Sequence, residues 1–231
     1  MTKIYSYILR IDDGAAPNPF GDLCTLAICK PAIRRTASIG DWVIGTGSKN
    51  TKLSDRKTYD FSNSIVYAMK ITDVKTLKEY DDFCKKSLKC KLPNWQSKDW
   101  KKRIGDCIYN YEVVGEPQMR NGVHNEGSRI TDLGGHNALM SDHFYYFGVE
   151  ARPLPANFKD LIKKNQGHKK VERLDLISEF EGWISQFQKN KLYADPQMKW
   201  IFEDDASESN ISACSKEKLE DDKDESEEPV C

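Results

Sequence analysis

The sequence predicts an α+β fold with a mixed, mostly antiparallel sheet, and three observations lead to this prediction. Short apolar runs with strand-like alternation recur through the first 150 residues. Helix-like spacing of apolar residues appears mainly toward the C-terminal end. Strands and helices do not alternate regularly, as they would in a doubly wound parallel sheet. A sheet of this kind can stay open or close into a barrel, and the sequence pattern does not distinguish the two forms.

Four strands are expected in the first third of the chain. Apolar and aromatic residues dominate residues 3–11, and a loop rich in Gly and Pro follows. The nearly continuous apolar run at residues 23–29 is typical of a buried strand. Residues 41–46 and 64–74 are apolar runs next to Gly, Asp and other residues that favour turns, so we expect strands there too.

The rest of the chain combines strands with helices. A short helix is expected over residues 76–86, and strands are expected over residues 106–114 and 143–149. Apolar residues then recur every three or four positions from 171 to 189, which predicts an amphipathic helix. An Asp-Pro pair favours the start of a last helix that ends at Phe202.

The charge of the chain is divided between a basic body and an acidic tail. Residues 203–231 carry twelve acidic and three basic side chains, a net charge of −9. The whole chain has 36 acidic and 35 basic side chains, so residues 1–202 carry 24 and 32, a net charge of +8. We therefore expect one domain over residues 1–202, and an acidic tail over 203–231 that is disordered and dispensable for folding. The basic domain suits a polyanionic partner, although scattered lysines also serve solubility.

Composition also limits the location and the cofactors that the sequence supports. The mean hydropathy of −0.68 and the absence of a long apolar run predict no membrane-spanning helix. The first residues lack the pattern of a signal peptide, which favours a cytoplasmic protein. The seven cysteines are irregularly spaced, so we expect reduced thiols. No metal site is predicted, and neither a cofactor nor a protein partner can be named.

Residues 14–48 form the first candidate binding region. They join APNPFG, an apolar CTLAIC run, the basic KPAIRR and GDWVIGTGS. Glycines let a ligand approach the backbone, Asn can read a base edge, aromatic rings can stack on a base, and basic residues can hold phosphates. The glycines do not have P-loop spacing. A purely structural interpretation is therefore also open, in which APNPFG is a rigid loop and GDWVIGTGS is a strand between two turns. The ligand-binding candidates in this region are Asn18, Phe20, Lys30, Arg34, Trp42, Thr46, Gly47 and Ser48.

Residues 120–148 form the second candidate region. Three of the four histidines lie here among many polar residues and glycines, a composition that predicts a long functional loop. If the protein is an enzyme, Asp132, His136 and His143 are acid–base candidates and Cys24 is a candidate nucleophile. His136 and Asn137 are also ligand-binding candidates. Solvated loop histidines are the simpler interpretation, so no residue is assigned as catalytic.

We expect the two regions to meet in one cavity. Such a cavity would be lined by Phe20, Trp42, Thr46, His136 and Asn137, with an aromatic ring stacked on a base. The alternative is that Trp42 belongs to the core, in which case its replacement costs stability rather than binding.

Two segments of the sequence resemble a known family. YSYILRIDDGAAPNPFGDLCTLAICKPAIRRTASIGDWVIGTGS resembles the opening of the bacterial family called nucleotide modification-associated domain, type two, and DHFYYFGVEARPLP resembles a later part of it. The resemblance covers residues 3–165 and leaves the helical end and the tail outside. It implies a role linked to modified nucleotides or bases in DNA, in modification or phage defence. It supplies no catalytic residues.

A looser resemblance concerns the fold. GDWVIGTG followed by SIVYAMKITDV is similar to the opening strands of PUA and EVE domains, which read modified bases in an aromatic pocket. This likeness implies a PUA-like barrel with Trp42 and Tyr67 near such a pocket. Likeness of fold does not establish function.

The leading functional hypothesis is recognition of a nucleotide or modified nucleobase in a DNA modification or phage-defence pathway. Two alternatives stay open. One is an enzyme that acts on a nucleotide or base by group transfer or glycosidic cleavage. The other is a binder that sequesters a small nucleotide signal. The expected partner in all three is a nucleotide or a nucleic acid.

Overall fold

The computed structural model describes residues 1–203. Within them, the strands are β1 (Ile4–Leu9), β2 (Cys24–Leu26), β3 (Trp42–Gly47), β4 (Thr51–Lys52), β5 (Thr58–Tyr59), β6 (Ser64–Lys70), β7 (Asp73–Thr76), β8 (Tyr109–Asn110), β9 (Gln118–Met119), β10 (Asn137–Ser141), β11 (Phe144–Tyr146), β12 (Arg152–Pro153), β13 (His168–Val171) and β14 (Lys191–Leu192). The helices are α1 (Pro31–Thr36), α2 (Leu77–Ser87), α3 (Trp100–Arg103), α4 (Arg129–Leu133), α5 (Leu174–Ile184) and α6 (Trp200–Glu203), with 3-10 turns η1 (Lys89–Lys91), η2 (Glu126–Ser128), η3 (Gly148–Glu150) and η4 (Ala156–Leu161).

The main sheet is mixed and mostly antiparallel, which confirms the expected α+β class. Its strands follow the order β13-β1-β3-β6-β11-β14, and β12 pairs with β6 beside this path. The pairs β1–β3 and β11–β14 are parallel, and the other pairs of this sheet are antiparallel. A second, three-stranded sheet has the order β2-β10-β7.

The sequence is compatible with a closed barrel, but no barrel forms among the described residues. The main sheet ends at β13 on one side and at β14 on the other. Residues 64–74, expected as one strand, instead divide into β6 of the main sheet and β7 of the second sheet. Because β7 and β10 pair with each other and not with the main sheet, the chain leaves that sheet before it could close.

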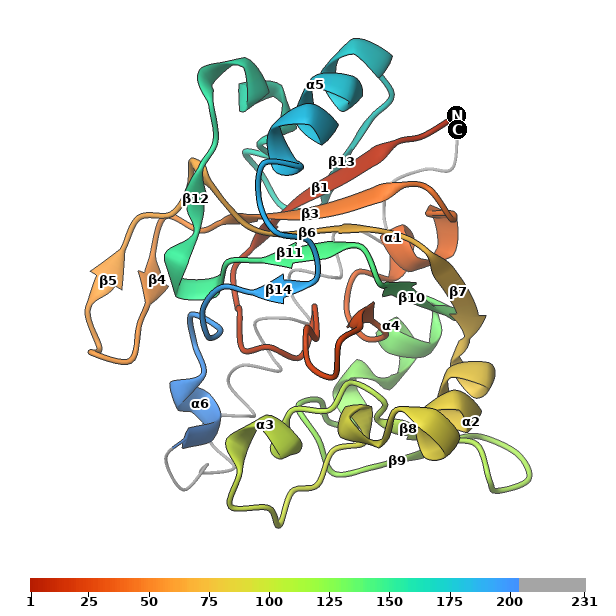
Figure 1. The fold of residues 1–231 in the computed structure, drawn as a ribbon. Coiled ribbons are helices and arrows are strands. Elements are labelled where there is room, and N and C mark those ends of the chain that lie inside the picture. Colours follow the sequence, from red (N-terminus) through yellow and green to blue (C-terminus); the bar gives the residue numbers. More distant parts are fainter. Residues whose placement is uncertain (204–231) are drawn as a thin grey trace.

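Two hydrophobic clusters pack against the main sheet, on opposite faces. Side chains of neighbouring strand residues point to opposite faces, so in β1 Tyr7 belongs to the first cluster and Ile4 to the second. The first cluster also holds Cys29. The second includes Trp42 and residues of α5, and α5 lies on the other side of the main sheet from β10, α4 and α2 (Figure 1).

Two other elements are shorter than expected. The amphipathic helix begins at Leu174 rather than at Val171, since Val171 pairs with Ile4 as the last residue of β13. The apolar run at 23–29 contributes only the three residues of β2, and its last residues form a turn. The predicted tail lies outside the described residues except for Glu203, which ends α6. No helix in the described part of the chain is long and apolar enough to cross a membrane.

Candidate active site

Cys29 occupies a turn between strand β2 and helix α1. Cys29 and Lys30 have φ angles of +57° and +44°, the left-handed region that side chains other than Gly rarely adopt. Each such residue costs of order 1–3 kcal/mol and persists only where its surroundings impose it. Two bonds impose it here, because the backbone N–H of Cys29 donates to Asp132 Oδ1 at 3.0 Å and the carbonyl of Cys29 accepts from Arg34 Nε at 2.7 Å.

The thiol of Cys29 begins a chain of hydrogen bonds with an imidazole and a carboxylate. Cys29 Sγ lies 3.3 Å from His124 Nε2, and His124 Nδ1 lies 2.6 Å from Asp132 Oδ2. All three residues are buried. With the Nδ1 proton directed at Asp132, Nε2 is the nitrogen that can accept the thiol proton. A nucleophile, a base and a carboxylate that orients the base are the parts of a cysteine-dependent active site.

Asp132 is held ionised at the centre of this arrangement. Burial alone would raise the pKa of Asp132, but the charge and hydrogen bond of His124, the charge of Arg34 and the N–H of Cys29 lower it below its ordinary value. The hydroxyl of Tyr109 donates to the same Oδ2 at 3.0 Å. Burial, followed by the nearby Asp132 carboxylate, raises the pKa of Tyr109, so Tyr109 remains a donor. The carboxylate can therefore stabilise an imidazolium at His124.

Arg34 joins the two segments that carry the site. Its Nη2 donates to the carbonyl of Asp132 at 2.5 Å and its Nη1 to the carbonyl of Asn137 at 2.9 Å, while Asn137 Nδ2 donates back to the carbonyl of Arg34 at 3.2 Å. A Cβ on Gly135 would lie 2.2 Å from the Arg34 guanidinium carbon, so only Gly fits beside it. The sequence-predicted candidates Arg34, Asp132 and Asn137 are thus brought together, with Arg34 in a positioning role.

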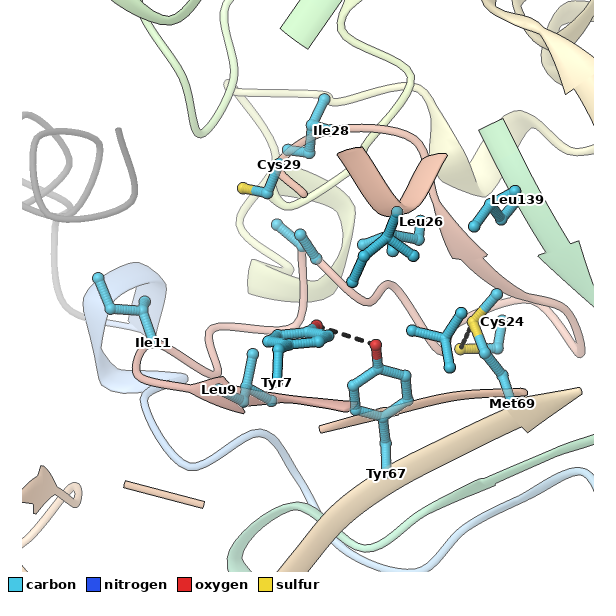
Figure 2. Packing of buried hydrophobic residues seen from close by; sticks show 14 of the residues in the cluster. Tyr7, Leu9, Ile11, Cys24, Leu26, Ile28, Cys29, Tyr67, Met69 and Leu139 are labelled. Carbon is cyan, nitrogen blue, oxygen red and sulfur yellow. Dashed lines mark hydrogen bonds between the residues drawn. The ribbon is translucent and has the colours of Figure 1, made fainter. Parts of the chain in front are cut away.

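Lys30 carries positive charge into the same region. Its side chain is buried, with Nζ 5.0 Å from the centre of the Tyr7 ring. The hydroxyls of Tyr7 and Tyr67 meet at 2.9 Å below the turn that holds Cys29 (Figure 2). Because burial raises the pKa of Tyr67 well above its ordinary value, that hydroxyl stays neutral. The Lys30 ammonium therefore packs on an aromatic ring of the first cluster, and Lys30 directly follows the candidate nucleophile Cys29 in the sequence.

A comparison with protein families decides what kind of domain carries this site. The family model described as nucleotide modification associated domain 2 matches residues 1–204. The chain belongs to this family. The match includes the helical C-terminal part and so extends beyond residues 3–165, where the sequence resembles the family. No curated protein and no solved structure matches the chain significantly. Among the described residues, no three His, Cys, Asp or Glu side chains gather as a metal site would require.

In this nucleotide modification associated domain, Cys24 lies in an environment unlike that of Cys29. Cys24 is fully buried, and its Sγ lies 3.8 Å from Met69 Sδ (Figure 2). Burial raises the pKa of the Cys24 thiol to about 12, so it stays protonated at neutral pH. The geometry therefore favours Cys29 as the nucleophile.

The five residues expected to line one cavity do not all come together in the structure. Trp42 belongs to the second cluster, where its ring packs 5.5 Å from Phe180 between ring centres. Phe20 packs against the first cluster, with Trp100 at 5.9 Å. Since the two clusters cover opposite faces of the main sheet, the structure does not bring Trp42 and Phe20 together.

Two candidate histidines also lie outside the Cys29 site. His136 is exposed and has a φ of +58°, in the turn before β10. His143 lies 5.3 Å from the Trp42 ring, and its Nε2 lies 3.3 Å from the Tyr145 hydroxyl. Burial first, and then the charges of Lys189 and Lys70, lower the pKa of His143.

The remaining loop candidates make contacts within the protein. Asn18 Nδ2 donates to the carbonyl of Ile104 at 2.8 Å, and Asn18 Oδ1 accepts from the buried Lys91 Nζ at 2.8 Å. The Thr46 hydroxyl donates to the carbonyl of Tyr7 at 3.2 Å. Gly47 lies against Phe61, where a Cβ would meet the Phe61 side chain at 2.3 Å. Ser48 follows Gly47, and its carbonyl accepts from the backbone N–H of Phe61 at 2.9 Å.

Cys29 and His124 are the two functional candidates that sequence reasoning missed. A signal for Cys29 was present, because the apolar run ending in Cys29 is followed by Lys-Pro, and Pro favours the first position of a helix. A nucleophile on a sharp strand-to-helix turn is a recurring arrangement in hydrolases. His124 had no such signal, since it lies 95 residues from Cys29 and only the fold brings the two together.

Proposed function

We propose that this protein is a cysteine-dependent enzyme that acts on a nucleotide or nucleobase in a nucleotide-modification pathway. The observation that carries the proposal is the hydrogen-bonded series from Cys29 Sγ through His124 to Asp132. The description of the family supports the nucleotide as substrate. A protein that only binds a nucleotide does not need a thiol, an imidazole and a carboxylate joined by hydrogen bonds. An enzyme is therefore favoured over a protein that only reads a base or sequesters a nucleotide.

The reaction would proceed through a covalent intermediate on Cys29. His124 Nε2 takes the thiol proton, and the Cys29 sulfur forms a bond to an electrophilic carbon of the base or of a group attached to it. The bond from that carbon to its leaving group breaks, and the leaving group takes the proton from His124. Water or a second acceptor then attacks the same carbon and gives its proton to His124, and the sulfur departs and recovers that proton. Asp132 stabilises the imidazolium in both steps.

The proposal is tested first by the ionisation of Cys29. A thiol has an ordinary pKa of about 8.5, whereas a thiol paired with an imidazole ionises well below neutrality. We expect the ultraviolet absorbance of the folded protein to show a thiolate at pH 7 that disappears in Cys29→Ala and in His124→Ala. Cys24→Ala is the matched control and should leave that absorbance unchanged, because burial raises the pKa of Cys24. A titration in which Cys29 ionises at the ordinary pKa would rule out the nucleophile.

The nucleotide substrate is tested separately by mass spectrometry. The protein is incubated with the common ribonucleotides and deoxyribonucleotides and with digested DNA from the cells that make it, then quenched in acid. We expect added mass on the peptide that holds Cys29, and none in Cys29→Ala. If Cys29 is a thiolate but no adduct forms, the reactive thiol would remain supported and the nucleotide would be rejected as its substrate. Binding that Cys29→Ala leaves unchanged, with no turnover by the unmodified protein, would instead favour recognition; a part in phage defence stays a prediction.

A further inference from the structure

The described part of the chain contains an open basic groove that the Cys29 chemistry does not use. Its volume is about 940 Å³, and it lies between the end of β1, the loop after β3 and the segment that joins η4 to β13. We call it the lysine groove, after its six cationic residues. These residues are Arg10, Lys49, Lys159, Lys163, Lys164 and Lys169.

The positive charge of the lysine groove is almost uncompensated by the residues that line it. Asp160 is the one carboxylate among its lining residues, so six cations and one anion leave a net charge of +5. Asp160 Oδ2 lies 3.3 Å from Arg173 Nη1, while the Asp160 backbone carbonyl accepts from Lys169 Nζ at 2.5 Å. Much of the +8 charge carried by residues 1–202 is therefore gathered along this groove.

The lysine groove and the Cys29 site lie on opposite faces of the main sheet. Ile8 lines the groove, whereas its neighbour Tyr7 points into the first cluster and lies under the ammonium of Lys30. On the groove side, the Ser6 hydroxyl donates to the carbonyl of Leu161 and ties η4 to β1. The groove is thus a separate surface with a fixed floor, and it does not form the wall of the Cys29 site.

The chemistry of the lining residues selects the ligand. Lysines bind phosphates as point charges, and polar amides such as those of Asn63 and Gln166 can bond to phosphate or sugar oxygens. No aromatic side chain lines the groove, so it offers no ring on which a base could stack. Its volume is far larger than one phosphate requires. These features fit several phosphates of a polymer backbone better than one mononucleotide.

We propose that the lysine groove binds the phosphate backbone of a nucleic acid without reading its sequence. Two residues expected from the sequence to bind a ligand, Gly47 and Ser48, lie in this groove. Lys30 and Arg34, expected from the sequence to hold phosphates, are buried on the other face. The groove holds a polynucleotide whether or not Cys29 is the nucleophile.

The test compares two triple variants that lose the same charge. In the groove variant, Lys49→Gln, Lys159→Gln and Lys164→Gln replace three exposed lysines of the groove. In the control variant, Lys86→Gln, Lys89→Gln and Lys98→Gln replace three exposed lysines elsewhere. Binding of a fluorescent oligonucleotide of mixed sequence, single-stranded or duplex, is measured by anisotropy over a series of salt concentrations, with the full chain.

We expect the groove variant to bind at least about tenfold more weakly and the control variant to change less than about twofold. The slope of log affinity against log salt should decrease in magnitude by about 2 for the single strand, because three phosphate contacts are lost. Melting temperatures of both variants should match that of the original protein. Equal weakening in the two variants, or no binding by the unmodified protein, would overturn the proposal. So would groove-dependent binding to anionic lipid vesicles with none to DNA.

Discussion

The two faces of the main sheet carry polar side chains in opposite ways. On the Cys29 face, Asp132, His124 and Arg34 are buried, and each has hydrogen-bond partners at fixed distances. On the other face, the lysine groove gathers six cationic side chains along an open surface. Buried groups with defined partners suit a reaction, which needs one geometry. Exposed lysines suit a long polyanion, which needs only charge along a path. The comparison suggests a division of labour between chemistry and binding.

The largest effect that would sharpen this comparison is expected at Trp42. Trp42 is buried on the face opposite Cys29, and its Nε1 donates to Glu181 Oε1 at 2.9 Å. Trp42→Ala should reduce the free energy of unfolding by about 3–5 kcal/mol, measured by urea denaturation, because it leaves a large cavity. In protein that remains folded, the thiolate absorbance of Cys29 should not change.

Trp42→Phe is the matched control, since it keeps an aromatic ring and removes the bond to Glu181. It should cost clearly less stability than Trp42→Ala. Loss of the Cys29 thiolate in either folded variant would show that the two faces are coupled, and the division of labour would then be abandoned.

Asp132→Asn, on the Cys29 face, should cost less stability than Trp42→Ala. It should, however, strongly reduce the fraction of Cys29 that is ionised. The amide offers one acceptor where the carboxylate offers two, so buried donors lose their partner, at a cost of about 1–3 kcal/mol. The Cys29 thiolate at pH 7 should largely disappear, because the imidazolium of His124 loses its counterion. Asp142→Asn, at an exposed position, is the control and should change stability by less than about 0.5 kcal/mol.

Asp132 also predicts a pH dependence. Its pKa is lower in the folded protein than the value of about 3.9 in an unfolded chain. Its contribution to stability is therefore complete above about pH 4 and is lost as the pH falls toward the lower folded pKa. Urea denaturation between neutral pH and pH 3 should show this acid loss in the original protein and a smaller one in Asp132→Asn. Equal acid sensitivity would contradict an ionised Asp132.

The smallest effect is expected from residues 204–231, which lie outside the described part of the chain. These residues carry eleven acidic and three basic side chains, a net charge of −8. A protein that ends at Glu203 should bind DNA severalfold more tightly at low salt, because a competing polyanion has been removed, and the difference should vanish near 1 M salt. Its melting temperature should stay the same. A large drop on truncation would show that these residues help to hold the domain together.

Local sequence patterns predicted the strands and helices whose bounds do not depend on pairing with distant segments. The strands at residues 3–11 and 41–46 and the helix at 76–86 correspond to β1, β3 and α2, because alternation and capping residues act within a few positions. The basic groove was visible only as a net charge, since the charged residues come from distant segments. The split of residues 64–74 into β6 and β7 was not predictable, because it depends on pairing with β10.

The candidate active site shows the same limit more sharply. Asp132 was named from its loop, but its partners Cys29 and His124 were not. A cysteine is chemically ordinary until an imidazole is placed beside it, and that placement is a property of the fold. The sequence therefore identified the two regions that carry the site without identifying the pairs within them.

The distance along the chain between Cys29 and its partners has a consequence for the newly made protein. Asp132, which binds the backbone of Cys29, is synthesised 103 residues later. At ribosomal rates this separation corresponds to roughly 5–20 s. His124 follows Cys29 by 95 residues, so for most of that interval the thiol lacks its base, and for all of it the thiol lacks the bond that imposes its turn. During this time Cys29 is an ordinary, weakly acidic cysteine. Under the proposed mechanism, Cys29 therefore becomes reactive only after both segments of the site have been synthesised and have folded together.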